Sequence, residues 1–163
     1  MHSDLALPIP RRRFLQAGAA FAAASFLPPG ISSAAGVDER RLTVASGRAA
    51  MLGKGNPETD VWTYDSVFPG PLLRVRQGQP VRIVVENRLD EDTTVHWHGI
   101  RLPNAIDGVP GLTQPPIRPG ESFVYEFTPP DAGTFWYHPH ANSLEQLGRG
   151  LAGVLIVEEA EPA

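Results

Sequence analysis

The sequence has 163 residues, 14 basic and 18 acidic side chains and no cysteine, and its formal net charge at pH 7 is −4 with histidine neutral. The absence of cysteine excludes a disulfide, a thiolate nucleophile and a thiolate ligand for a metal, and the acidic balance offers no basic patch for nucleic acid or anionic lipid. The 17 prolines and 16 glycines, without a sustained 3.6-residue apolar period, favour an all-β fold rich in turns.

Residues 1–35 have the pattern of an export signal. Three arginines at residues 11–13 precede an apolar, alanine-rich stretch at residues 14–27, and residues 33–35 supply the small side chains of a cleavage site. This stretch is too short to cross about 30 Å of hydrocarbon comfortably as a helix, so no membrane anchor is expected, although a retained anchor is the alternative. The consecutive arginines resemble a twin-arginine signal, and an ordinary Sec signal stays open. Either signal predicts an exported protein, in a bacterial periplasm.

Residues 36–163 are enough for one domain with its own core. Because residues 1–35 hold three arginines and one aspartate, the domain keeps 11 basic and 17 acidic residues, a net charge near −6. We expect strands at residues 41–46, 61–64, 72–76, 80–86, 93–98, 122–127, 134–138 and 151–157, and a helical turn at residues 143–147. In the fourth strand, Val81, Ile83 and Val85 share one face. Seven or eight short strands predict a Greek-key β-sandwich or small barrel.

Four of the five histidines form two pairs with one intervening residue, His96 with His98 and His138 with His140. In a β-strand, residues i and i+2 point to the same face about 6.6 Å apart, so each pair directs two imidazoles into one space. Because both pairs lie where a predicted strand ends, two strand ends can bring four neutral imidazoles together. Imidazole suits copper, zinc, iron and nickel. Core or turn histidines without a metal are the alternative interpretation.

The neighbours of the histidine pairs suit a metal site. Trp97 and Trp136 flank the pairs, and as core aromatics they would exclude water from the metal. Residues 99–119 form a long irregular excursion that starts at the first pair. Excursions of this length inside a compact domain are usually functional or disordered.

Four runs of sequence carry a family resemblance. They are residues 96–99, 102–111, 113–117 and 133–140. With two histidine pairs about forty positions apart, these runs resemble the first cupredoxin (plastocyanin-like) domain of multicopper oxidases, the laccase-like enzymes. The resemblance covers nearly all of residues 40–158 and implies a cupredoxin-like fold for residues 36–163.

The resemblance implies copper as the metal. In such enzymes a trinuclear copper cluster lies between the first and last cupredoxin domains and reduces dioxygen to water with electrons from a separate type 1 copper. By position, His96 resembles a type 2 copper ligand, His98 and His138 resemble ligands of one type 3 copper, and His140 resembles a ligand of the other. Asp107 is similar to an acidic residue that assists proton delivery, which oxygen reduction needs where imidazoles are committed to metal. Asp107 followed by glycine is also an ordinary turn dipeptide.

The chain also departs from the family pattern. Family members bring four more histidines and the cysteine of the type 1 copper from a C-terminal cupredoxin domain, in HxxHxH and HCHxxxH runs that this sequence lacks. Residues 158–163 resemble the start of an interdomain linker. We therefore expect the N-terminal domain of a longer oxidase, truncated or encoded separately. Its partners would be a C-terminal cupredoxin domain or a separately encoded partner, dioxygen, and a phenol, diamine or metal ion as the reductant.

Two other functions stay open from the sequence. A non-catalytic periplasmic copper-binding module needs no cysteine. A mononuclear zinc hydrolase is the third hypothesis, because four imidazoles can make a closed tetrahedral site. A catalytic zinc wants an open position and a general base, for which only Asp107 is on offer.

Overall fold

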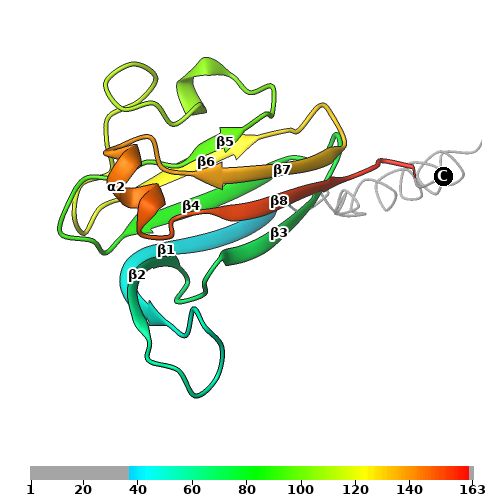
Figure 1. The fold of residues 1–163 in the computed structure, drawn as a ribbon. Coiled ribbons are helices and arrows are strands. Elements are labelled where there is room, and N and C mark those ends of the chain that lie inside the picture. The colour runs from blue at the N-terminus through cyan, green and yellow to red at the C-terminus, as the bar shows by residue number, and fades with distance from the viewer. Residues whose placement is uncertain (1–36, 162–163) are drawn as a thin grey trace, which may run out of the picture. The chain divides into compact units, whose positions relative to one another are not determined.

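The computed structural model describes residues 37–161, so the export signal predicted at residues 1–35 lies outside the described part. Within residues 37–161 the chain forms eight strands, one 3-10 helix and one short α-helix (Figure 1). In chain order they are β1 (Asp38–Ala49), β2 (Thr59–Tyr64), β3 (Gly70–Arg76), β4 (Val81–Asn87), β5 (His96–His98), η2 (Asn104–Ile106), β6 (Ser122–Phe127), β7 (Gly133–His138), α2 (Ser143–Gly148) and β8 (Gly153–Glu158). The all-β prediction is confirmed. No helix in this part of the chain has the length and apolar character needed to span a bilayer.

The strands form two four-stranded sheets, which we call sheet A (β2-β1-β4-β6) and sheet B (β3-β8-β7-β5). The pairs β1–β4 and β3–β8 are parallel, and the other neighbours are antiparallel. From β2 to β7 the chain changes sheet at every step, so each sheet is assembled from strands distant in sequence. This alternation is the Greek-key arrangement expected of a sandwich.

The core lies between the two sheets and follows the predicted alternation. Val81, Ile83 and Val85 of β4 are at most 1% exposed. Arg82 points the other way and makes ion pairs with Glu39 at 2.7 Å and Glu126 at 2.8 Å on the outer face of sheet A. The period-two pattern therefore correctly assigned the inner face of β4.

Two strands differ in length from the prediction. β1 is longer than residues 41–46 because it pairs with β4 through Val44 and with β2 from Val44 onward. β5 is shorter than residues 93–98. The backbone of Thr93 instead exchanges two hydrogen bonds with Ile117, at 3.0 and 2.8 Å, and the Val95 N–H donates to the hydroxyl of Tyr125 at 2.9 Å.

All three tyrosines lie in the core, which predicts how stability depends on alkaline pH. Burial raises the pKa of Tyr125 to about 12 and also raises the pKa values of Tyr64 and Tyr137. Tyrosines of the unfolded chain ionise near pH 10. The stability that depends on neutral tyrosines is therefore complete below about pH 10 and is lost as the pH rises toward 12.

We expect tyrosinate ultraviolet absorption to rise together with the loss of the near-ultraviolet circular dichroism signal, because ionisation requires exposure. Normal titration of one or more tyrosines near pH 10, with the circular dichroism signal intact, would contradict the burial described above.

Candidate metal centre

The ladder between β5 and β7 joins the two histidine pairs. His96 lies opposite His138, and His98 lies opposite Trp136. Because alternate residues of a strand share a face, these side chains lie on the outer face of sheet B, while Trp97 between the first two histidines is buried in the core. Two pairs about forty residues apart are thus placed side by side, as the sequence predicted.

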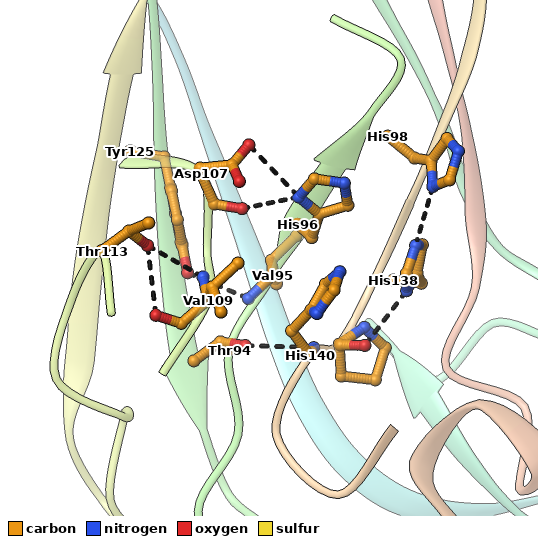
Figure 2. A network of polar contacts seen from close by, with 11 residues as sticks. Thr94, Val95, His96, His98, Asp107, Val109, Thr113, Tyr125, His138 and His140 are labelled. Atoms are coloured by element: carbon orange, nitrogen blue, oxygen red, sulfur yellow. Dashed lines mark hydrogen bonds and ion pairs between the residues drawn. The ribbon is translucent and has the colours of Figure 1, made fainter. Parts of the chain in front are cut away.

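All four imidazoles gather in one cluster, with His140 two residues beyond the end of β7 (Figure 2). The ring centroids of His96 and His140 are 4.6 Å apart, and those of His96 and His98 are 5.5 Å apart. The centroid of His138 lies 5.4 Å from those of His96 and His140 and 5.5 Å from that of His98. One ring nitrogen from each of His96, His138 and His140 lies within 4.8 Å of the others.

Backbone carbonyls set the tautomers of two rings. The Nδ1 of His96 lies 2.6 Å from the carbonyl oxygen of Asp107, and the Nδ1 of His138 lies 3.0 Å from that of Pro139. A carbonyl accepts only, so each Nδ1 carries the proton and each Nε2 keeps a free lone pair. Such second-sphere hydrogen bonds orient imidazoles that ligate metals.

The fourth histidine supplies a test of whether a metal ion fits. The Nδ1 of His98 lies 3.3 Å from the Nε2 of His138. Two nitrogen ligands at 2.0–2.1 Å from one ion in tetrahedral geometry are also separated by about 3.3 Å. The cluster offers nitrogen donors, which suit copper or zinc rather than magnesium or calcium. The residues present therefore fit a nitrogen-ligated transition metal.

Two of the histidines are held in the form that binds metal. Burial lowers the pKa of His138 and of His140, and the neighbouring imidazoles lower both further. Both side chains are therefore neutral at pH 7. A metal ion needs the neutral imidazole, so this environment avoids competition with protons.

A family model described as multicopper oxidase matches residues 44–162. The chain belongs to the multicopper oxidase family. It is 42% identical over 127 residues to a copper resistance protein A homolog of Pseudomonas syringae pv. tomato. The aligned region is 78% of this chain and 21% of the relative. It is 43% identical over 111 residues to Laccase-1 of Cryptococcus neoformans var. grubii, and this aligned region is 66% of this chain and 18% of the relative.

Solved structures agree with the family. The crystal structure of a multicopper oxidase from Pseudomonas thermotolerans is similar with a TM-score of 0.74 and 50% identity, covering 78% of this chain and 31% of that one. The blue copper oxidase from Nitrosomonas europaea gives a TM-score of 0.73 and 36% identity, covering 78% and 41%. The cupredoxin-like fold prediction and the family are thus confirmed, and the family implies copper binding. The chain spans about a fifth of the length of the curated relatives it matches.

Asp107 of this multicopper oxidase domain lies beside the histidine cluster, directly after η2. Its carboxylate Oδ1 is 3.4 Å from the Nδ1 of His96, and its side chain is partly exposed. The next residue explains this placement. Gly108 has φ +83°, and a Cβ built on it would lie 2.0 Å from the carbonyl oxygen of Val95. The excursion can therefore rest against the residue before His96 only because this position is glycine.

The two tryptophans beside the histidines differ from each other. Trp97 is a core aromatic, as predicted, and is fully buried. Trp136 lies on the outer face and stacks on His138, with ring centroids 4.0 Å apart and planes at 25°. Its ring centroid is also 4.9 Å from that of His98. Trp136 therefore packs directly on the candidate ligands rather than filling the core.

The sequence interpretation missed a group of polar residues behind the cluster in this oxidase domain. Thr94 accepts the backbone N–H of His140 at 3.1 Å, and Gln146 of α2 is fully buried and hydrogen-bonded to Thr93. The signal that could have revealed them was weak. A glutamine in a short helical turn and two threonines before a strand are usually solvated.

Proposed function

We propose that His96, His98, His138 and His140 supply half of the ligands of a trinuclear copper cluster in a multicopper oxidase, which reduces dioxygen while a phenol, diamine or metal ion is oxidised. The observation that carries this proposal is the cluster of four imidazoles: the β5–β7 ladder brings His96, His98 and His138 together, and the ring centroid of His140 lies 4.6 Å from that of His96. Family membership supports copper as the metal. The 3.3 Å separation of His98 and His138 nitrogens supports their sharing one type 3 copper, with His96 toward the type 2 copper.

When bound, the copper ions would transfer electrons to dioxygen, and the chain's own residues would hold and orient the site. The Asp107 carbonyl fixes the ring of His96 through Nδ1, so Nε2 faces the cluster. The carboxylate of Asp107 lies between that ring and solvent. It is placed to take a proton from water at Oδ1 and release it toward the site, where the imidazoles cannot act as acids.

The outer face of sheet B is the surface we assign to the rest of the oxidase. Next to Trp136 on β7 lies Val154 on β8, which is 42% exposed, and Leu72 on β3 is 51% exposed. Ion pairs lie on both outer faces, from Arg82 on sheet A and between Arg74 and Glu158 on sheet B, so the histidine cluster is what distinguishes the face of sheet B. The four histidines, which supply half of the proposed ligands, share this face of sheet B with the exposed apolar side chains. A C-terminal cupredoxin domain or a separately encoded partner would therefore cover the face. The predicted signal at residues 1–35 supports a periplasmic or otherwise exported location.

One further function is favoured by a specific observation. The four imidazoles are nitrogen donors of a kind that suits copper, so they can also serve a non-catalytic copper-binding module. The two functions differ in whether a partner domain confers oxygen reduction. No observation in residues 37–161 favours the zinc hydrolase hypothesis, whereas the family match supports copper as the metal.

Copper titration tests the proposed ligands. We expect the His96→Ala/His140→Ala double variant to bind copper(II) at least about tenfold more weakly than the parent in isothermal titration calorimetry, since loss of even a supporting partner costs about 10- to 100-fold. Glu126→Ala is the control, because Glu126 lies on the outer face of sheet A and pairs with Arg82 rather than with the histidines. Equal affinity of the double variant and the parent would show that the site is misplaced.

A further inference from the structure

We infer that Gln146, Thr93 and Thr94 form a polar clamp that fixes His140 relative to His96, and that they are positioning residues of the copper site. The inference deepens the proposed function and rests on it for the identity of the metal. The clamp itself joins the segment before the first histidine pair to the segment after the second.

The centre of the clamp is the side chain of Gln146, which is fully buried. Its Nε2 donates to the Glu91 carboxylate at 2.6 Å and to the Asp92 carbonyl at 2.8 Å. Its Oε1 accepts from the hydroxyl of Thr93 at 2.7 Å. Both ends of the amide are thus satisfied inside the protein, and a buried polar network in which every member has a partner specifies one arrangement.

A second hydrogen bond connects the start of α2 to Glu91, in the segment that precedes β5. Asn142, directly before α2, has a left-handed backbone with φ 43°, and its Nδ2 donates to the Glu91 carboxylate at 3.2 Å. One carboxylate oxygen therefore receives hydrogen bonds from Asn142 and Gln146. These contacts fix where the chain goes immediately after His140.

The clamp reaches His140 through Thr94. His140 lies beyond the last ladder pair, which joins His96 to His138, so the β5–β7 ladder does not hold its backbone. Its N–H donates instead to Oγ1 of Thr94 at 3.1 Å, and Thr94 is fully buried (Figure 2). Thr94 is two residues before His96. The side chain of Thr94 therefore connects the backbone of His140 to the segment that carries His96. The ring centroids of these two histidines are 4.6 Å apart.

This arrangement has a consequence for metal geometry. A ligand on an irregular segment needs partners that lock its backbone, because small displacements change the donor separation. His138 is held by the sheet, whereas His140 depends on Thr94 and on the Gln146 contacts that hold Thr93 next to it. Loss of the clamp should leave the fold in place and let the His140 imidazole take several positions.

The experiment uses the full chain with Thr94→Val, which keeps the branched shape and removes the hydroxyl, and Gln146→Met, which keeps the length and removes the amide. Thr94→Ser is the matched control, because it retains the acceptor. In the metal-free proteins, NMR should show one His140 ring environment in the parent and in Thr94→Ser, and several or broadened signals in Thr94→Val and Gln146→Met. With copper(II), the same two variants should give heterogeneous electron paramagnetic resonance spectra and about 10- to 100-fold weaker binding.

The outcomes separate the clamp from the proposed function. A lower melting temperature in either variant, with the His140 signals of the parent, would overturn the inference, since the network would then only support the fold. If the parent bound no copper while the His140 signals still responded to Thr94→Val and recovered in Thr94→Ser, the proposed function would fail and the clamp would stand. Should Thr94→Val not fold, the comparison of Gln146→Met with the parent decides between the two.

Discussion

The copper-loaded chain by itself should show no intense blue absorption and no oxygen uptake with a phenol or a diamine. The reason is its inventory of ligands. The two pairs supply four imidazoles, and the chain has no cysteine. Intense blue copper sites need a thiolate ligand, and the resemblance places that site, which delivers the electrons, in a C-terminal domain. A second copy of this chain could add imidazoles but no cysteine thiolate, so self-association would not restore activity.

An oxygen electrode and a visible spectrum measure this expectation. Addition of a C-terminal cupredoxin domain from the same genome should restore both the blue band and oxygen consumption. In the matched control, the same domain added to the His96→Ala/His140→Ala variant should restore the blue band alone, because the type 1 site belongs to the partner. Oxygen consumption by the isolated chain at enzymatic rates, abolished in the double variant, would contradict the proposal.

Gly108→Ala should damage both stability and the metal site. Its φ of +83° disfavours any side chain, at a cost of about 1–2 kcal/mol. The new Cβ would also lie 2.0 Å from the carbonyl oxygen of Val95, a backbone atom that no rotamer change can move away. Crowding of this kind typically adds about 1–3 kcal/mol. The loop must retreat, and it would carry the carbonyl of Asp107 away from His96.

Gly111→Ala is the matched control for this prediction. Gly111 has φ +75°, and a Cβ built there would meet no atom within 4 Å, so the substitution carries the backbone cost alone. We expect denaturant unfolding to show a loss of about 2–5 kcal/mol for Gly108→Ala and about 1–2 kcal/mol for Gly111→Ala. Copper affinity should fall about 10- to 100-fold only in Gly108→Ala. If the two variants lost equal stability and had equal copper affinity, the close approach of Gly108 to Val95 would not contribute to either property.

The sequence predicted the strands where a local pattern determines them. The alternation of Val81, Ile83 and Val85 is visible in a short window and is set by burial of one face. The limits of β5 were wrong because they depend on distant partners. Thr93 bonds to Ile117 and Val95 bonds to Tyr125, and no local pattern shows that these residues are taken out of the ladder.

The candidate site was predictable to a similar extent. The HxH spacing predicted that the two pairs come together, and the structure places His96, His98 and His138 on neighbouring strands with His140 two residues beyond the end of β7. The burial of Gln146 was not predictable, since a polar residue on a short helix is normally solvated and its three partners lie more than fifty residues away. The contact between Trp136 and His138 was predictable, because residues i and i+2 of a strand share a face, but the sequence interpretation placed Trp136 in the core instead. The copper types and the role of Asp107 stay predictions.

The histidine pair of β5 lies on the edge strand of sheet B among the described residues, and that strand is three residues long. An exposed edge normally invites another chain to add a strand through its free N–H and C=O groups. Here Gly99, with φ +89°, turns the backbone away directly after His98, so the edge is too short to act as a template. The edge at β5 therefore offers little backbone for strand addition, and its shortness keeps the exposed histidine pair from pairing with another chain through the backbone.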